Sequence, residues 1–137
     1  MTDALLMLQG AVNTRLRTTA AVTNLVSTRI YDFVPQDVTF PYVEIGDGQE
    51  IDDRIDDVDS VRLSITLHIW SRAVGKPQAS QIADAVLTAL HNQTLTLDAN
   101  WRMSTPLRRD QRQSLADPDG LTTHIVMNFT CAADPLT

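Results

Sequence analysis

The two histidines within alternating segments are the side chains best placed to bind a metal ion or to exchange protons. His68 and His124 would face one another if their two segments were neighbouring strands of a sheet. Cys131 is an odd number of residues from His124, so it would point to the opposite face of the same strand. Catalytic zinc generally needs three protein ligands, and this pattern therefore favours ordinary sheet-surface histidines over a metal site.

Other catalytic patterns are incomplete or missing. Gly75-Lys76 resembles part of a phosphate-binding loop, but Trp70 stands where the first glycine is needed and Pro77 where Ser or Thr is needed. Neither G-x-S-x-G nor H-E-x-x-H occurs. The single cysteine excludes an internal disulfide and a cysteine-based zinc finger. We therefore predict no enzyme activity and no cofactor.

An acidic segment contains seven carboxylates and a single arginine. The carboxylates are Asp47, Glu50, Asp52, Asp53, Asp56, Asp57 and Asp59. Their order does not match a calcium-binding EF-hand loop, which has glycine at its sixth position and glutamate at its twelfth. We predict a solvated loop or a protruding hairpin. If the segment has a role, an acidic projection that meets a basic partner is favoured over a metal cage.

A basic group and one tryptophan complete the candidate interface residues. Arg108, Arg109 and Arg112 are clustered in sequence, and a solvent-exposed edge is the simplest interpretation. Trp70 lies on the polar side of its alternating segment, so we expect either a helix or another subunit to cover its ring.

Charge and hydropathy exclude two classes of partner. The net charge of −6 and the absence of a large basic cluster argue against a protein that wraps nucleic acid. No apolar run is long enough to cross a bilayer, and the first residues lack the features of a signal peptide. We therefore expect no membrane partner and synthesis in the cytoplasm.

Four long segments define the expected fold. Apolar residues recur at helical spacing in residues 3–18 and 78–90, the second preceded by Pro77. Strict alternation over residues 60–71 and 121–132 predicts strands with one buried face. The 137 residues are expected to form one domain.

Shorter elements and turns join these segments. We predict a short helix or turn over residues 20–26, a strand ended by Gly46-Asp47-Gly48, a turn at 117–120 and a closing antiparallel hairpin. The strand candidates are residues 29–32, 42–45, 95–97 and 101–107. This order favours an α+β fold, with a mixed, largely antiparallel sheet and two main helices packed on one face.

The order of these features resembles the tail completion (tail terminator) family of siphophages, which also occurs in phage-derived gene transfer agents. The resemblance begins with the amphipathic N-terminal helix, VSTRIYDFVP at 26–35 and FPYVEIG at 40–46. It continues with Trp70-Ser71 at the end of an alternating strand, then Gly75 and a helix, and it closes on Asp119-Gly120 followed by a strand.

The resemblance implies a structural virion protein in the neck region of the tail, assembled in the bacterial cytoplasm. Six copies would form a ring that caps the head-proximal end of the tail tube and provides the head-docking surface. Its partners would be further copies of itself, the major tail tube protein and the head-tail connector proteins. DNA would pass through the ring without specific binding, and the acidic segment is one candidate for the lining of the channel.

Two alternatives remain open at this point. The chain could be a head-tail connector subunit of the neck, which the position of its gene would distinguish. It could also be a small ligand-binding α+β domain. That alternative requires a concave pocket with converging titratable groups.

Overall fold

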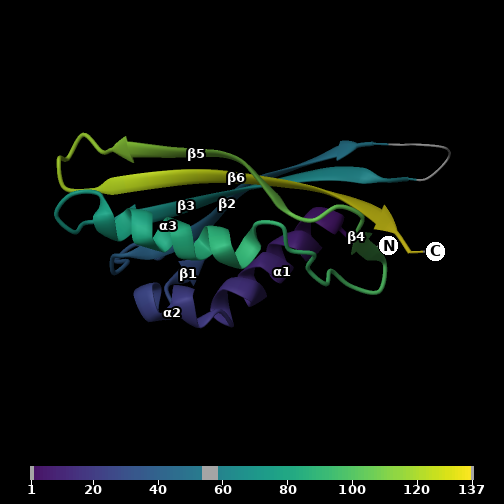
Figure 1. The fold of residues 1–137 in the computed structure, drawn as a ribbon, viewed down its shortest axis with the longest axis horizontal. Helices are drawn as coiled ribbons and strands as arrows, with labels where there is room; N and C mark the ends of the chain where they lie inside the picture. The colour runs from purple at the N-terminus through teal and green to yellow at the C-terminus, as the bar shows by residue number, and fades with distance from the viewer. Residues whose placement is uncertain (1, 54–58, 137) are drawn as a thin grey trace.

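A layer of helices covers one face of a curled sheet in the computed structural model, which describes residues 2–53 and 59–136 (Figure 1). The helices are α1 (Ala4–Arg17), α2 (Ala20–Val26) and α3 (Pro77–Leu90). The strands are β1 (Ile30–Tyr31), β2 (Tyr42–Asp52), β3 (Val61–Ser71), β4 (Trp101–Met103), β5 (Arg108–Ala116) and β6 (Thr123–Pro135). The predicted α+β class, with helices on one face, is confirmed.

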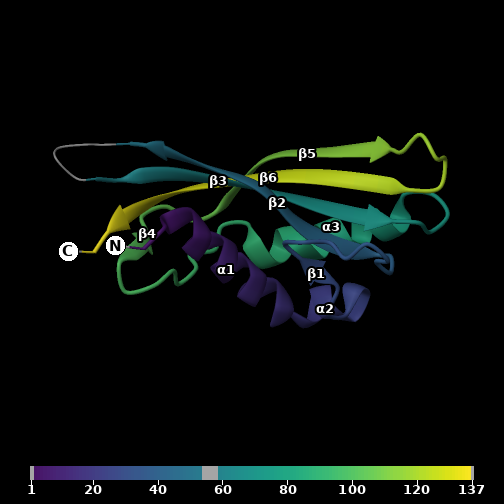
Figure 2. The ribbon, with the colours of Figure 1, turned by 180° about the vertical axis from the view of Figure 1, so that it is seen from behind.

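The sheet has the order β1-β2-β3-β6-β4. Strand β5 also pairs with β6, on the same edge of β6 as β4 and opposite β3. Among the described strands, β1 and β2 are parallel and the other pairs are antiparallel. The central pair, β3 and β6, runs without a register shift from Val61↔Ala133 to Ser71↔Thr123. Figure 2 views the molecule from behind and shows strands β2 and β3 extending beyond the helical layer.

Local sequence explains where two of the helices begin. The Asp3 carboxylate accepts hydrogen bonds from the backbone N–H groups of Leu5 at 3.0 Å and Leu6 at 3.2 Å, which caps α1. Pro77 begins α3, where its fixed φ suits the first helical turn. No helix in the described part of the chain is long and apolar enough to cross a membrane.

The core lies between the helices and the inner face of the sheet. Odd-numbered residues of β3 and β6 point inward, and Leu67, Met127 and Phe129 are fully buried. The apolar faces of α1 and α3 pack onto these strand residues through side chains such as Leu8 and Val86, which are also fully buried. The even-numbered residues of both strands form an open face with no helix above it in the described structure (Figures 1 and 2).

The strand predicted to end at Ile45 instead continues to Asp52. Gly46-Asp47-Gly48 forms a β-bulge rather than a turn, because the register with β3 shifts between Ile45 and Gly48. Gly46 is needed at this position. A Cβ there would lie 2.7 Å from Nε2 of His68, closer than van der Waals contact allows.

Two further strand boundaries differ from the prediction. Residues 95–97 are not a strand: Leu95 is buried within irregular chain, and its N–H donates to the sulfur of Met103 at 3.2 Å. The strand expected over 101–107 stops at Met103, and Leu107 makes an isolated bridge to Gln93. The charged stretch that follows is itself strand β5, which pairs with β6 through its backbone.

Candidate interaction surfaces

A row of aromatic rings crosses the open face of the sheet at one end. Phe40 packs edge-on against Tyr42 with ring centroids 5.1 Å apart, and Tyr42 stacks with Trp70 at 6.3 Å. Trp70 stacks on His124 at 3.7 Å with an interplanar angle of 10°. The Arg72 guanidinium lies 4.1 Å from the centroid of the Phe40 ring, which places a cation at one end of the row.

Trp70 is held in this row by its neighbours. Its indole N–H donates to a carboxylate oxygen of Glu44 at 3.1 Å, and its ring is only partly exposed. The helices lie on the other face of the sheet, so the helix expected to cover Trp70 is excluded (Figures 1 and 2). Coverage by another subunit stays a prediction.

The two histidines meet as expected, because β3 and β6 are neighbours. Nδ1 of His68 lies 2.7 Å from Nε2 of His124, so one ring donates a hydrogen bond to the other. Burial, and then the nearby His68, lower the pKa of His124 below its ordinary value. Cys131 lies on the opposite, buried face, as its parity predicts. Within 2–53 and 59–136, no three His, Cys, Asp or Glu residues are grouped to hold a metal ion.

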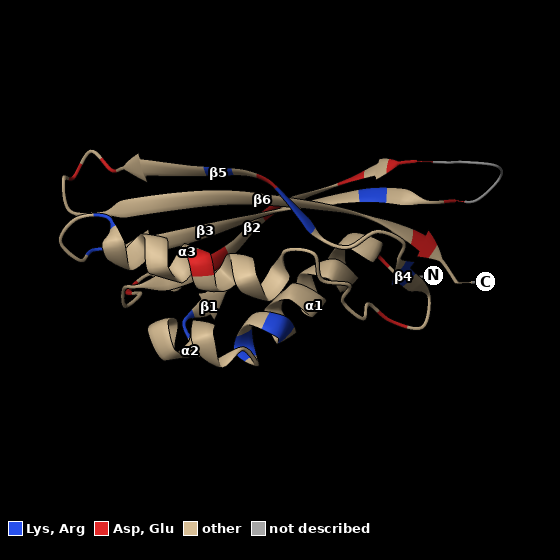
Figure 3. Cartoon of the chain, viewed as in Figure 1, with Lys and Arg blue, Asp and Glu red and all other residues tan. Residues whose placement is uncertain are grey.

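The acidic segment was predicted to be a solvated loop or a protruding hairpin, and its described part is mostly strand β2 of an antiparallel pair with β3. Asp47 lies in the bulge of β2, whereas Glu50 and Asp52 follow along its distal half, and all three are exposed. Glu50 and Asp52 pair with β3 through the backbone, which is why this half of the strand needs no apolar pattern to be ordered. Figure 3 shows acidic residues at this end of β2.

The remaining acidic candidates flank the hairpin end. Asp53 follows β2, and one of its carboxylate oxygens lies 3.6 Å from a guanidinium nitrogen of Arg62. Asp59 is exposed just before β3. Asp56 and Asp57 lie outside the described residues.

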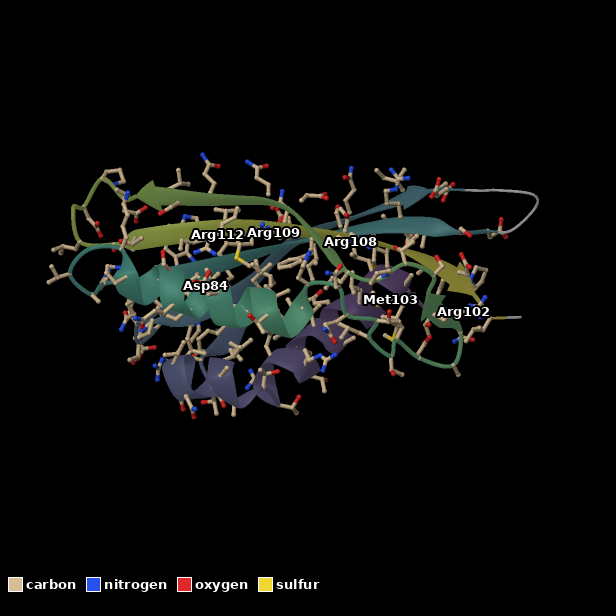
Figure 4. The ribbon with its side chains drawn as sticks, in the orientation of Figure 1. Asp84, Arg102, Met103, Arg108, Arg109 and Arg112 are labelled. Carbon is tan, nitrogen blue, oxygen red and sulfur yellow. The ribbon has the colours of Figure 1, made fainter. Side chains whose placement is uncertain are left out.

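The three predicted arginines lie on edge strand β5 but do not form one cluster. Arg108 is opposite Thr130, on the open face, whereas Arg109 and Arg112 are opposite inward-facing residues of β6. Arg108 and Arg109 are exposed, as expected for an edge. Arg112 contacts Asp84 of α3, with 2.6 Å between Nη1 and Oδ1, and Figure 4 shows Asp84 on the helix facing β5.

Several surface residues were missed by the sequence prediction. Phe40 and Tyr42 extend the aromatic row and Glu44 accepts the hydrogen bond of Trp70, contacts that depend on the pairing of β2 with β3. Asp84 is a polar residue of a helix, and its pairing with Arg112 bridges elements far apart in the chain. No local spacing signals either contact.

A basic side chain in one hollow of the described surface makes internal contacts. This hollow lies between α1 and β1 and contains Arg17 and Asp32. Arg17 donates to the backbone carbonyl of Ile30 and, at 3.0 Å, to the side chain of Asn13. Arg17 therefore joins α1 to β1 and supports the fold.

Comparison with known proteins identifies the family and the fold. A family model described as tail completion protein gp17 matches residues 10–134. A chain from the virion of a native gene transfer agent particle superposes with a TM-score of 0.86 at 24% identity, covering 97% of this chain and 99% of that one. The gp17 protein of bacteriophage SPP1 superposes with a TM-score of 0.63 at 22% identity, covering 93% and 89%. A search of curated proteins found no match. Because the family model extends over nearly all of the chain, this protein belongs to the tail completion protein gp17 family.

Proposed function

We propose that this chain is a structural subunit of a phage or gene transfer agent tail, and that copies of it form a ring on the head-proximal end of the tail tube. The match of the family model to residues 10–134 is the observation that carries the proposal. The shared fold with a chain from a gene transfer agent virion supports it.

The surface of the subunit suits assembly better than reaction. One face of the sheet has no helix over it in the described structure, and it carries partly exposed rings, including Trp70. Its outer strands present exposed charged side chains at two separate edges. Broad surfaces of this kind can contact several neighbours at once, as a ring that joins a tube to a head requires.

The proposed partners are further copies of the chain, the tail tube protein and the head-tail connector proteins. Six copies would match a tube with sixfold symmetry. The net charge of −6 would let DNA pass through the ring without specific binding, because phosphates are repelled by acidic side chains. The subunit would catalyse no reaction. It would be assembled in the bacterial cytoplasm and would stay in the neck of the particle.

Loss of the gene tests this function directly. Particles made without the protein should separate into filled heads and unjoined tails in electron micrographs. Purified protein added to those tails should form a ring at one end and restore joining to heads. Joined particles in the deletion strain would contradict the proposal.

The same experiment separates a tail cap from a neck connector. Gold-labelled protein should bind isolated tails at one end and should leave isolated heads unlabelled. Binding to heads alone would assign the chain to the connector.

A further inference from the structure

Two outer edges of the sheet carry opposite charge. On β5, Arg108 and Arg109 are exposed, and neither has an acidic partner among the described residues. On the distal half of β2, Asp47, Glu50 and Asp52 are exposed and equally without a basic partner in those ranges. We call these the basic edge (Arg108 and Arg109) and the acidic edge (Asp47, Glu50 and Asp52).

The two edges lie at the same level across the sheet. Arg109 is opposite Phe129 of β6. Phe129 is opposite Ile65 of β3, and Ile65 is opposite Gly48 of β2. A line drawn across the strands from Arg109 therefore ends next to Asp47. Both register shifts, in β5 and in β2, also lie at this level.

Strand direction makes a head-to-tail contact possible. Within one chain β5 is antiparallel to β6, β6 to β3, and β3 to β2, so β5 and β2 run in opposite directions. Rotation about an axis along the strands preserves direction and level. It would bring the basic edge of one copy beside the acidic edge of the next, and repeated rotation would close a ring.

We infer that the basic edge of one copy docks against the acidic edge of the next copy in the ring. The inference rests on the proposed function and supplies its subunit contact. The contact is made by side chains, because the backbone N–H of Arg109 already donates to Nδ1 of His91 at 3.2 Å and both strands are bulged. On the same stretch, Asp110 already accepts a hydrogen bond from Thr130.

Charge also selects between the possible modes of association. A two-fold contact would place basic edge on basic edge, or acidic edge on acidic edge, and like charges repel. A head-to-tail contact pairs opposite charges at every interface. Head-to-tail contacts are the kind that form rings, whereas two-fold contacts end at a dimer.

Charge reversal provides the test. In Arg108→Glu/Arg109→Glu both edges are acidic, and in Asp47→Arg/Glu50→Arg, which keeps Asp52, both have a net positive charge. Each variant alone should need about tenfold or more protein than the native chain to form rings on tails that lack it. The chain that carries all four changes should recover, because its two edges are again opposite. Native mass spectrometry and electron microscopy of the tail ends give the readout.

A mixture of the two double variants gives a sharper result. The acidic variant can pair only with the basic variant, so the mixture should assemble with the two alternating around the ring. Such a ring closes only with an even number of subunits. Rescue by mixing shows that the two edges lie in the interface, and recovery of the chain with all four changes shows that unlike edges meet there.

Controls separate folding from assembly. Arg102 is an exposed residue of β4, and Arg102→Glu should assemble as the native chain does. Circular dichroism and thermal melting check that every variant is folded. Should a reversed variant unfold, Arg108→Gln/Arg109→Gln replaces it, and a smaller loss of assembly is then expected.

Each outcome decides the inference. Native-like assembly of either double variant, or of the glutamine variant, would overturn it but would leave the proposed function intact. A mixture that stays dissociated while both variants remain folded would overturn it as well. A native chain that forms no ring on tails would overturn both proposals together.

Discussion

Alanine at Gly46 should destabilise the protein, whereas alanine at Gly48, two residues away in the same bulge, should not. A Cβ at Gly46 would lie 2.7 Å from Nε2 and 2.8 Å from Cδ2 of His68. That ring is not free to turn aside, since its Nδ1 is hydrogen-bonded to His124 at 2.7 Å. At Gly48 the nearest atom is a methyl carbon of Leu5 at 2.8 Å, at the end of a flexible, partly exposed side chain.

The magnitudes follow from two opposing effects. Overpacking of this kind costs about 1–3 kcal/mol. Replacing glycine by alanine where φ is not positive stabilises by about 0.4–1 kcal/mol through the unfolded chain, and neither glycine has a positive φ. The free energy of unfolding should therefore fall by about 1–2 kcal/mol for Gly46→Ala. It should be unchanged, or rise by up to about 1 kcal/mol, for Gly48→Ala.

Urea unfolding followed by circular dichroism measures both values by linear extrapolation. The cause is tested by repeating Gly46→Ala in a His68→Ala background, where the ring is gone. There the substitution should cost less than about 0.5 kcal/mol, because the two sites are directly coupled. Equal stability of the two glycine variants, or the same cost with and without the His68 ring, would refute the reasoning.

Three further predictions concern charge and reactivity. Since the folded-state pKa of His124 lies below its unfolded value, the free energy of unfolding should decrease as pH falls through about 6.5 toward that folded pKa, and His124→Asn should flatten this dependence in urea titrations. A double-mutant cycle on Arg112→Ala and Asp84→Ala should give a coupling of only about 0.2–1 kcal/mol, decreasing with salt, because the Asp84 side chain is 69% exposed; a coupling insensitive to salt would contradict this. Burial raises the pKa of the Cys131 thiol to about 12, so at pH 8 a thiol reagent should label the native protein far more slowly than the urea-unfolded protein, and equal rates would show the thiol to be accessible.

Periodic burial is what made the main elements predictable from sequence. The strand around Leu67 and the helix around Val86 each bury one side in a shared core, so their apolar residues recur at the spacing of the element. The α+β class and the helices on one face follow from the order of these segments.

The errors occurred where backbone pairing alone holds a segment. Strand β5 has no fully buried residue, so nothing in its sequence alternates, yet β6 supplies partners for its backbone. Gly46-Asp47-Gly48 has the composition of a turn, but Gly46 serves to leave room for the ring of His68. The need for glycine at position 46 is set by a residue of another strand, so the sequence around Gly46 does not indicate it.

The candidate surface was partly predictable for the same reason. The parity of Trp70, His68 and His124 placed them on one face, and the structure joins them there. Tyr42 and Glu44 come from a strand whose register depends on the bulge, so their contact with Trp70 needs the structure.

The stack of Trp70 on His124 also provides an intrinsic fluorescence signal on the open face of the sheet. The two rings are only 3.7 Å apart, so the emission of Trp70 depends on what surrounds this stack. The other tryptophan, Trp101, is buried at the far end of β6, where its indole N–H donates to the carbonyl of Thr2 at 2.8 Å. Changes in ultraviolet fluorescence would therefore come from the open face, and the arrival of a neighbour on that face could be timed without attaching a dye.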